Sequence, residues 1–177
     1  MGILLSFAPW LLYWGLLSFH RLESAAIAGL AATLIMVIVE VARGRSLKIL
    51  PAGSLVYFLL LALAIPSLGA RPVGRWVDLA GGAALALIVL ISILVGKPFT
   101  LQYARETAPR ERWNDPVFFR KNLVISWVWF GAFLVNLGVP VSKRLGLELP
   151  LIANWVVSMC TFIAAMRFTH WYARPRG

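Results

Sequence analysis

The sequence predicts an all-α polytopic membrane protein, a bundle of about six transmembrane helices with both termini cytoplasmic. Three observations support this fold class. Of the 177 residues, 60% are hydrophobic, whereas soluble domains contain roughly 45–50%. The apolar residues form runs close to the ~20 residues that cross ~30 Å of hydrocarbon. Basic residues gather between these runs, and they do so unequally on the two sides of the predicted membrane.

Six apolar segments are the expected spans. They cover residues 3–19, 24–42, 52–69, 76–95, 123–141 and 150–171. Several are short, and Pro9 and Pro66 lie inside two of them. A proline removes one helical hydrogen bond and kinks the helix, although neighbouring helices can compensate. The third segment is therefore either a full span or a re-entrant, partly broken helix. We expect a single integral membrane domain over residues 1–177.

The positions of the basic residues set the expected orientation. With six spans, twelve of the 17 lysine and arginine residues share the side of the termini, and five lie opposite. The larger set comprises Arg43, Arg45, Lys48, Lys97, Arg105, Arg110, Arg112, Arg120, Lys121, Arg167, Arg174 and Arg176. The smaller set comprises Arg21, Arg71, Arg75, Lys143 and Arg144. Because cytoplasmic loops carry the excess of basic residues, both termini are predicted to be cytoplasmic.

Charge and motif content narrow the function classes. The net charge of +10 falls at the ends of apolar segments, which favours anionic lipid headgroups over nucleic acid as the partner. Cys160 is the only cysteine, so no internal disulfide or thiolate cluster is expected. His20 and His170 fall at opposite predicted faces, which argues against paired haem ligation. No motif of a metalloprotease, phosphate-binding loop or serine nucleophile is present. We therefore expect no catalytic, cofactor-binding or metal site.

Four polar side chains within the predicted spans are candidates for a functional role. Glu40 precedes a basic turn, so its carboxylate either pairs at the interface or serves a function; an unpaired charge at mid-bilayer costs roughly 2.5–3.5 kcal/mol. Asn136 and Asn154 lie deeper and are expected to bridge helices by hydrogen bonds. Arg167 lies near the end of the last span, from which its guanidinium can reach the surface.

Small residues recur at helical spacing in the second span. Ala25, Gly29 and Thr33 fall on one face, as do Gly82 and Ala86 in the fourth span. Small residues four apart allow helix backbones to approach closely in lipid. This pattern fits the seam of a homo-oligomer or packing within the chain, and we favour the second.

The long polar segment at residues 96–121, expected in the cytoplasm, is called the basic elbow here. Pro98 predicts a break after the fourth span, and Pro109 limits any short helix. Asp115 followed by Pro116 is typical of a helix N-cap and first turn, so the fifth helix should begin early. The elbow is either a lipid-facing connector or a docking surface for a protein partner. The candidate contact residues are Lys97, Phe99, Tyr103, Arg105, Arg110, Arg112, Trp113, Phe118 and Phe119.

The order of these parts resembles the intracellular septation protein A family of bacterial inner-membrane proteins. The residues that carry the resemblance are Phe7-Ala8-Pro9, the basic turn at 43–48, Lys97-Pro98, and the run 122–130 with Asn136. The resemblance implies a non-enzymatic scaffold or accessory component in cell-envelope maintenance or septation, in contact with other membrane proteins. The main alternative is a small transporter or channel for an ion, lipid or other small molecule. A third is a membrane enzyme acting on lipid-linked substrates.

Overall fold

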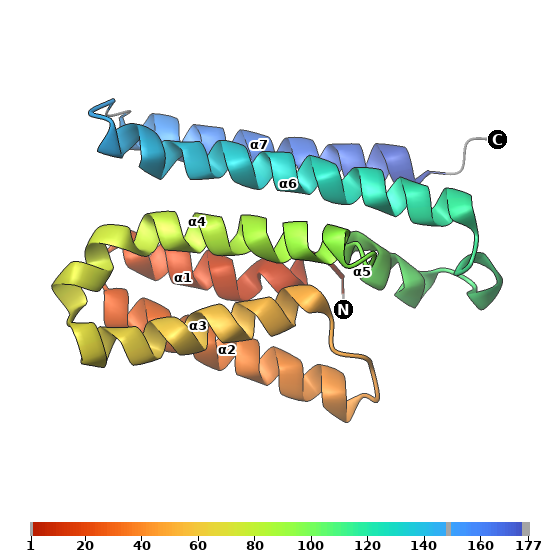
Figure 1. Cartoon of the computed structure of the whole chain (residues 1–177), viewed down its shortest axis with the longest axis horizontal. Helices are drawn as coiled ribbons and strands as arrows, with labels where there is room; N and C mark the ends of the chain where they lie inside the picture. Colours follow the sequence, from red (N-terminus) through yellow and green to blue (C-terminus); the bar gives the residue numbers. More distant parts are fainter. Residues whose placement is uncertain (1, 148–149, 175–177) are drawn as a thin grey trace. The chain divides into compact units, whose positions relative to one another are not determined.

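The computed structural model describes residues 2–147 and 150–174, and these residues form helices and turns with no strand (Figure 1). Arg176 of the charge count lies outside them. The elements, in chain order, are the 3-10 turn η1 (Leu5–Phe7), α1 (Ala8–Ser18), α2 (Leu22–Ala42), α3 (Ile49–Leu68), α4 (Ala70–Leu94), α5 (Phe99–Thr107), the 3-10 turn η2 (Arg110–Arg112), α6 (Pro116–Arg144) and α7 (Leu151–Ala173).

Five of the described helices, α2, α3, α4, α6 and α7, are long and apolar enough to cross a membrane. The first apolar helix, Leu5–Ser18, is shorter; at 1.5 Å per residue it measures about 21 Å, against ~30 Å of hydrocarbon. The predicted starts of the fourth and fifth spans, at residues 76 and 123, come several residues after the observed starts of α4 and α6. Hydropathy marks only the apolar part of a helix, whereas the helical backbone continues through charged residues on either side.

The third apolar segment is one continuous helix. α3 runs from Ile49 to Leu68, and Pro66 lies in its last turn. A proline there removes a hydrogen bond only where the helix is about to end, so it does not break the segment. Gly69 follows with φ of 88°, a left-handed conformation that favours glycine and turns the chain into α4. The structure therefore has one unbroken helix here, long and apolar enough to span a membrane.

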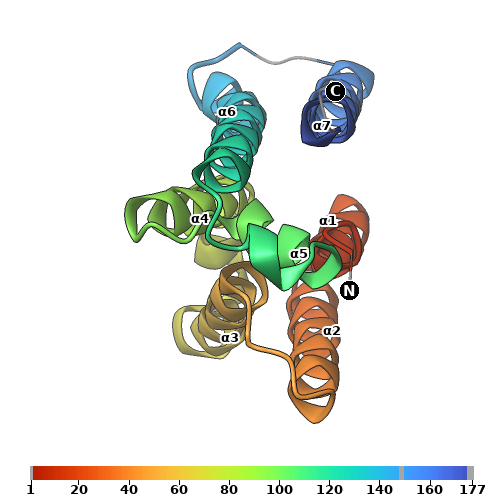
Figure 2. The same cartoon turned by 90° about the vertical axis from the view of Figure 1, so that its right-hand side faces the viewer.

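The chain divides into two compact units, Met1–Ala84 and Leu85–Gly177. Within the first unit, α1 packs along α2 and α2 along α3, in antiparallel order (Figure 1). Within the second unit, α6 and α7 run antiparallel and side by side, and α5 packs on α6 (Figures 1 and 2). That the whole chain forms a single domain stays a prediction.

Aromatic rings fill the core of the first unit. Trp10, Tyr13 and Phe58 are fully buried, and the ring of Trp10 stacks on that of Tyr57 with centroids 4.9 Å apart. The Trp10 Nε1–H donates a hydrogen bond of 2.8 Å to Ser54 Oγ on α3. A buried indole needs such an acceptor, so this bond fixes α1 against α3.

The small residues of α2 pack within the chain. Ala25 and Thr33 are fully buried, and a Cβ at Gly29 would lie 2.5 Å from Cε1 of Phe58 on α3. Only glycine allows this approach of the two helices. The favoured prediction for this stripe, packing inside the protein, is confirmed.

Candidate functional site

The basic elbow begins with a tight reversal after α4. Gly96 has φ of 68°, and the backbone N–H of Lys97 donates to Ser92 O over 2.9 Å. The Ser92 hydroxyl accepts the backbone N–H of Phe99 over 3.1 Å. Because glycine adopts a positive φ without strain, the chain turns here and starts α5 directly after the buried Pro98. The predicted break at Pro98 is confirmed.

One face of α5 is buried against α6. The ring of Phe99 meets that of Trp129 edge to face, with centroids 6.3 Å apart. Thr100 Oγ1 donates to the backbone carbonyl of Asn122 over 2.8 Å and lies 2.8 Å from Ser126 Oγ. Both hydroxyls are buried, where a lost partner would cost about 1–3 kcal/mol. Packing and hydrogen bonding together hold α5 at the start of α6.

Trp113 makes the contacts that hold the part of the elbow between α5 and α6. Its Nε1–H donates to Ala108 O over 3.2 Å, and Arg105 Nη2 donates to Trp113 O over 3.3 Å. The guanidinium carbons of Arg105 and Arg110 lie 5.6 Å and 5.9 Å from the Trp113 ring centroid. At these distances the electron-rich face of the ring attracts both cations. Two arginines are therefore fixed on one indole.

The start of α6 follows the prediction from the Asp115-Pro116 pair. The Asp115 carboxylate accepts the backbone N–H of Val117 over 2.8 Å, and Pro116 occupies the first turn. This capping satisfies one of the otherwise unpaired N–H groups at the helix start. The predicted early start of the fifth apolar helix is confirmed.

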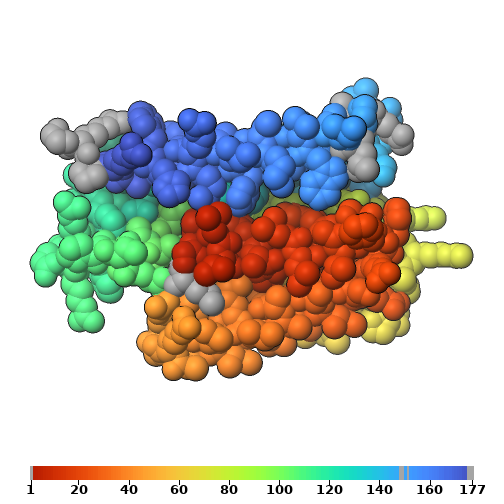
Figure 3. Space-filling view, turned by 180° about the vertical axis from the view of Figure 1, so that it is seen from behind, coloured from red at the N-terminus to blue at the C-terminus, as the bar shows by residue number. Residues whose placement is uncertain are grey.

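The structure separates the nine predicted contact residues into three groups. Phe99 and Tyr103 are buried within the chain. The half-buried residues are Arg105, Trp113, Phe118 and Phe119. The exposed residues are Lys97, Arg110 and Arg112. Long side chains stand out from the green segment in the space-filling view (Figure 3). Among these nine residues the exposed ones are all cationic, and the aromatic ones are buried or half-buried.

Most other basic residues lie near the ends of the helices in each unit. In the second unit, Lys121 Nζ donates to Arg174 O over 3.2 Å, so the end of α7 lies beside the elbow, while Lys143 and Arg144 belong to the far end of α6. In the first unit, residues 43–48 join α2 to α3. Arg21 directly precedes α2, and Arg71 and Arg75 lie in the first turns of α4, which follows the other end of α3.

Glu40 forms a buried ion pair. It is 2% exposed and Lys48 is 4% exposed, and the Lys48 ammonium donates to the Glu40 carboxylate. Arg45 lies 3.5 Å from the other carboxylate oxygen. Pairing of Glu40 at the basic turn is confirmed. The sequence did not identify Lys48 as the partner of Glu40, because Lys48 comes close to Glu40 only after the chain has reversed direction in the turn.

The other three intramembrane candidates differ from one another. Asn136 Nδ2 donates to Thr161 Oγ1 over 2.7 Å, so it bridges α6 and α7 as expected. Asn154 is half-buried, and its buried Oδ1 accepts no hydrogen bond from the described residues. Arg167 is exposed on α7. Only Asn136 therefore acts as the predicted interhelical bridge.

Sequence reasoning missed the hydroxyl groups of the interior. The Tyr13 and Tyr57 hydroxyls lie 2.9 Å apart, and Thr100 and Ser126 form the pair described above. A hydroxyl within an apolar run gives no sequence signal of its partner. Among the described residues, no group of three or more histidine, cysteine, aspartate or glutamate side chains is placed to hold a metal ion.

No known family model, curated protein or solved structure matches this chain.

Proposed function

We propose that the chain is a non-enzymatic multi-pass protein of the bacterial inner membrane, acting as a scaffold or accessory component in cell-envelope maintenance or septation. In this proposal six helices cross the bilayer and both termini are cytoplasmic. The observation that carries it is the basic elbow, a folded segment that buries Phe99 and Thr100 against α6 and exposes Lys97, Arg110 and Arg112.

A folded elbow suits docking because little of it has to be ordered when a partner binds. Ordering of side chains and loops is one of the main costs of association, and here Thr100, Trp113 and Asp115 already fix the backbone. Exposed cations then speed encounter and select partners of opposite charge. The proposed partner is an acidic cytoplasmic segment of another envelope protein.

The distribution of charge supports the proposed orientation. The turn at residues 43–48, the elbow and the end of α7 carry most of the basic residues. If all six apolar helices cross the bilayer, these segments share one side, as the positive-inside rule requires of cytoplasmic segments. The short first helix then needs local thinning of the bilayer or help from flanking residues.

The interior polar groups support a scaffold over a transporter. Glu40 is paired with Lys48, and Asn136 bonds to Thr161 between α6 and α7. The first contact holds α2 to the residue that precedes α3, and the second joins α6 to α7. The resemblance to the septation protein A family points in the same direction, toward contacts with other membrane proteins.

Quantitative co-purification tests this function. The full chain is isolated in a gentle detergent, and bound envelope proteins are measured by mass spectrometry for the wild type and for K97Q/R112Q. Both substitutions are at exposed elbow residues, so the fold should persist while specific partners fall by about tenfold.

The matched control is R21Q/K143Q, which removes two exposed positive charges that are not part of the elbow. It should retain the partners. Equal retention by K97Q/R112Q and wild type would refute docking through the elbow. Saturable flux in liposomes that is lost on Glu40→Gln, Asn136→Ala or Asn154→Ala would instead establish the transporter alternative.

A further inference from the structure

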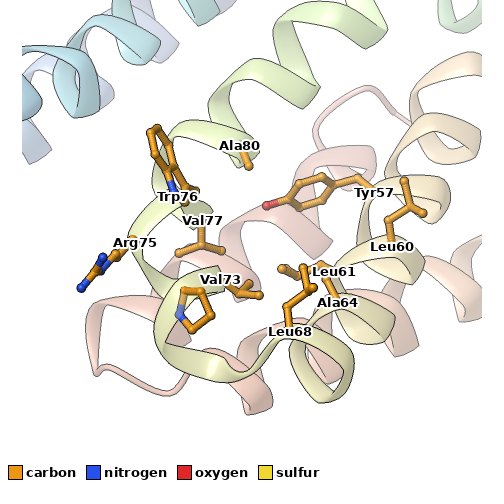
Figure 4. Close-up of a pocket in the computed structure, with 11 residues that line it drawn as sticks. Tyr57, Leu60, Leu61, Ala64, Leu68, Val73, Arg75, Trp76, Val77 and Ala80 are labelled. Atoms are coloured by element: carbon orange, nitrogen blue, oxygen red, sulfur yellow. The ribbon is translucent and has the colours of Figure 1, made fainter.

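An apolar groove of about 450 Å³ lies in the first unit, between α3 and the first turns of α4 (Figure 4). Its volume falls in the range of ~300–1,000 Å³ that is usual for ligand sites. Its lining residues are Tyr57, Leu60, Leu61, Ala64, Leu68, Pro72, Val73, Arg75, Trp76, Val77 and Ala80. Its lining includes none of the residues proposed to dock a partner.

Two helical stripes form the groove. On α3 the lining residues follow helical spacing from Tyr57 to Leu68. On α4, Val73, Val77 and Ala80 do the same, together with their neighbours Pro72, Arg75 and Trp76. Residues at this spacing share one helix face. Figure 4 shows Val73 and Val77 turned toward the α3 side chains. Alanines at positions 64 and 80 leave space where larger side chains would close the gap.

The floor of the groove suits hydrocarbon. Tyr57 supplies the one hydroxyl among its lining residues, and this hydroxyl lies 2.9 Å from that of Tyr13. A polar ligand would find few groups to orient it there. A flexible alkyl chain needs none.

The mouth of the groove has a different chemistry. Arg75 and Trp76 line it and extend away from the α3 side chains (Figure 4). Arg71 lies one turn before Arg75, so both guanidinium groups belong to one face of α4, and both residues are exposed. Tryptophan is enriched at headgroup depth, and arginine there attracts anionic phosphates.

We propose that this groove binds one acyl chain of an anionic phospholipid, whose phosphate lies against Arg71 and Arg75. Lipid tails are as apolar as leucine, so exchange of one tail for another within a bilayer has little hydrophobic driving force. Selectivity must therefore come from the charged mouth and from the fit of the chain. A preference for anionic over zwitterionic lipid at this groove is the property that separates a binding site from ordinary lipid contact.

Photo-crosslinking of the full chain in nanodiscs tests the proposal. The probes are phosphatidylglycerol and phosphatidylcholine that carry the same photoreactive acyl chain, and adducts are mapped by peptide mass spectrometry. Adducts on residues 57–80 should be about tenfold more abundant with phosphatidylglycerol, because each arginine near the surface favours the anionic lipid. R71Q/R75Q should make the two lipids equal.

A second variant tests binding of the lipid's acyl chain rather than of its headgroup. Ala64→Leu fills the groove and should lower the adducts at residues 57–80 with both probes, whereas Ala31→Leu, at an exposed α2 position, should not. Equal adducts from the two lipids in the wild type would overturn the proposal. So would unchanged adducts in both Ala64→Leu and R71Q/R75Q, since labelling would then reflect general lipid contact.

Discussion

Two basic connections have different environments in this protein. In the turn at residues 43–48, Lys48 is buried and paired with Glu40. In the elbow at residues 96–121, Lys97 and Arg112 are exposed, and the buried contacts are made by aromatic rings and hydroxyl groups. The comparison teaches that a basic loop can stabilise its own helix hairpin or present charge to a partner. In the first turn the Glu40 carboxylate on α2 holds Lys48, while Arg43 and Arg45 of the same turn are exposed.

The largest loss of stability is expected when the buried ion pair between Glu40 and Lys48 is broken. Glu40→Ala leaves the Lys48 ammonium buried without its carboxylate and should destabilise the protein by about 3 kcal/mol. Thermal unfolding in detergent measures the loss. Adding Lys48→Met to Glu40→Ala should recover much of it. Arg45→Gln is the control, with a change below about 1 kcal/mol, because the Arg45 side chain is 40% exposed.

The next effect concerns the packing of the same helix hairpin. Gly29→Ala places a methyl group 2.5 Å from the buried Phe58 ring, and such overpacking costs about 1–3 kcal/mol. The control is Gly15→Ala, because a Cβ at Gly15 meets no atom within 4 Å. If both variants unfold at the wild-type temperature, the close contact of α2 with α3 is wrong.

A smaller effect is expected where the elbow is attached to α6. Thr100→Val removes the hydroxyl that bonds to Asn122 O and should weaken this attachment by about 1 kcal/mol. Hydrogen–deuterium exchange over residues 99–107 should then rise about fivefold. Thr107→Val, at an exposed residue of the same helix, should leave exchange in the rest of α5 unchanged. Equal exchange in Thr100→Val and wild type would show that this bond does not hold the elbow.

The smallest effect on stability is expected from the exposed charges of the elbow. K97Q/R112Q should change the free energy of unfolding by no more than about 0.5 kcal/mol, although it should reduce partner binding. Thermal unfolding beside the co-purification measurement separates the two effects. A destabilisation as large as that of Glu40→Ala would remove the distinction between the two connections.

The sequence was sufficient for features that depend on neighbours along the chain. The apolar runs predicted the helices, Asp115-Pro116 predicted the start of α6, and the spacing of Ala25, Gly29 and Thr33 predicted a packed face. Contacts between distant segments could not be predicted in the same way. Phe99 alternates with polar residues and was expected at a partner surface, yet its ring meets Trp129. Hydropathy describes the average environment of a residue and does not identify the side chain that covers it.

The groove between α3 and α4 illustrates the same limit. Its alanines and valines are ordinary residues of an apolar helix. The space exists only because α3 and α4 lie opposite each other with these small side chains between them. The charges at its mouth were visible in the sequence as Arg71 and Arg75. Their relation to a hydrocarbon-lined groove required the structure.

The most direct test of the distinction between the two connections is photo-crosslinking in intact cells from one exposed position in each. The same photoreactive amino acid is placed at position 112 of the elbow and, in a second variant, at position 43 of the first turn; both arginines are exposed. Position 112 should yield adducts with a defined envelope protein, and position 43 should yield none above background. Equal protein adducts from both positions, or only lipid adducts from position 112, would contradict the proposed docking role of the elbow.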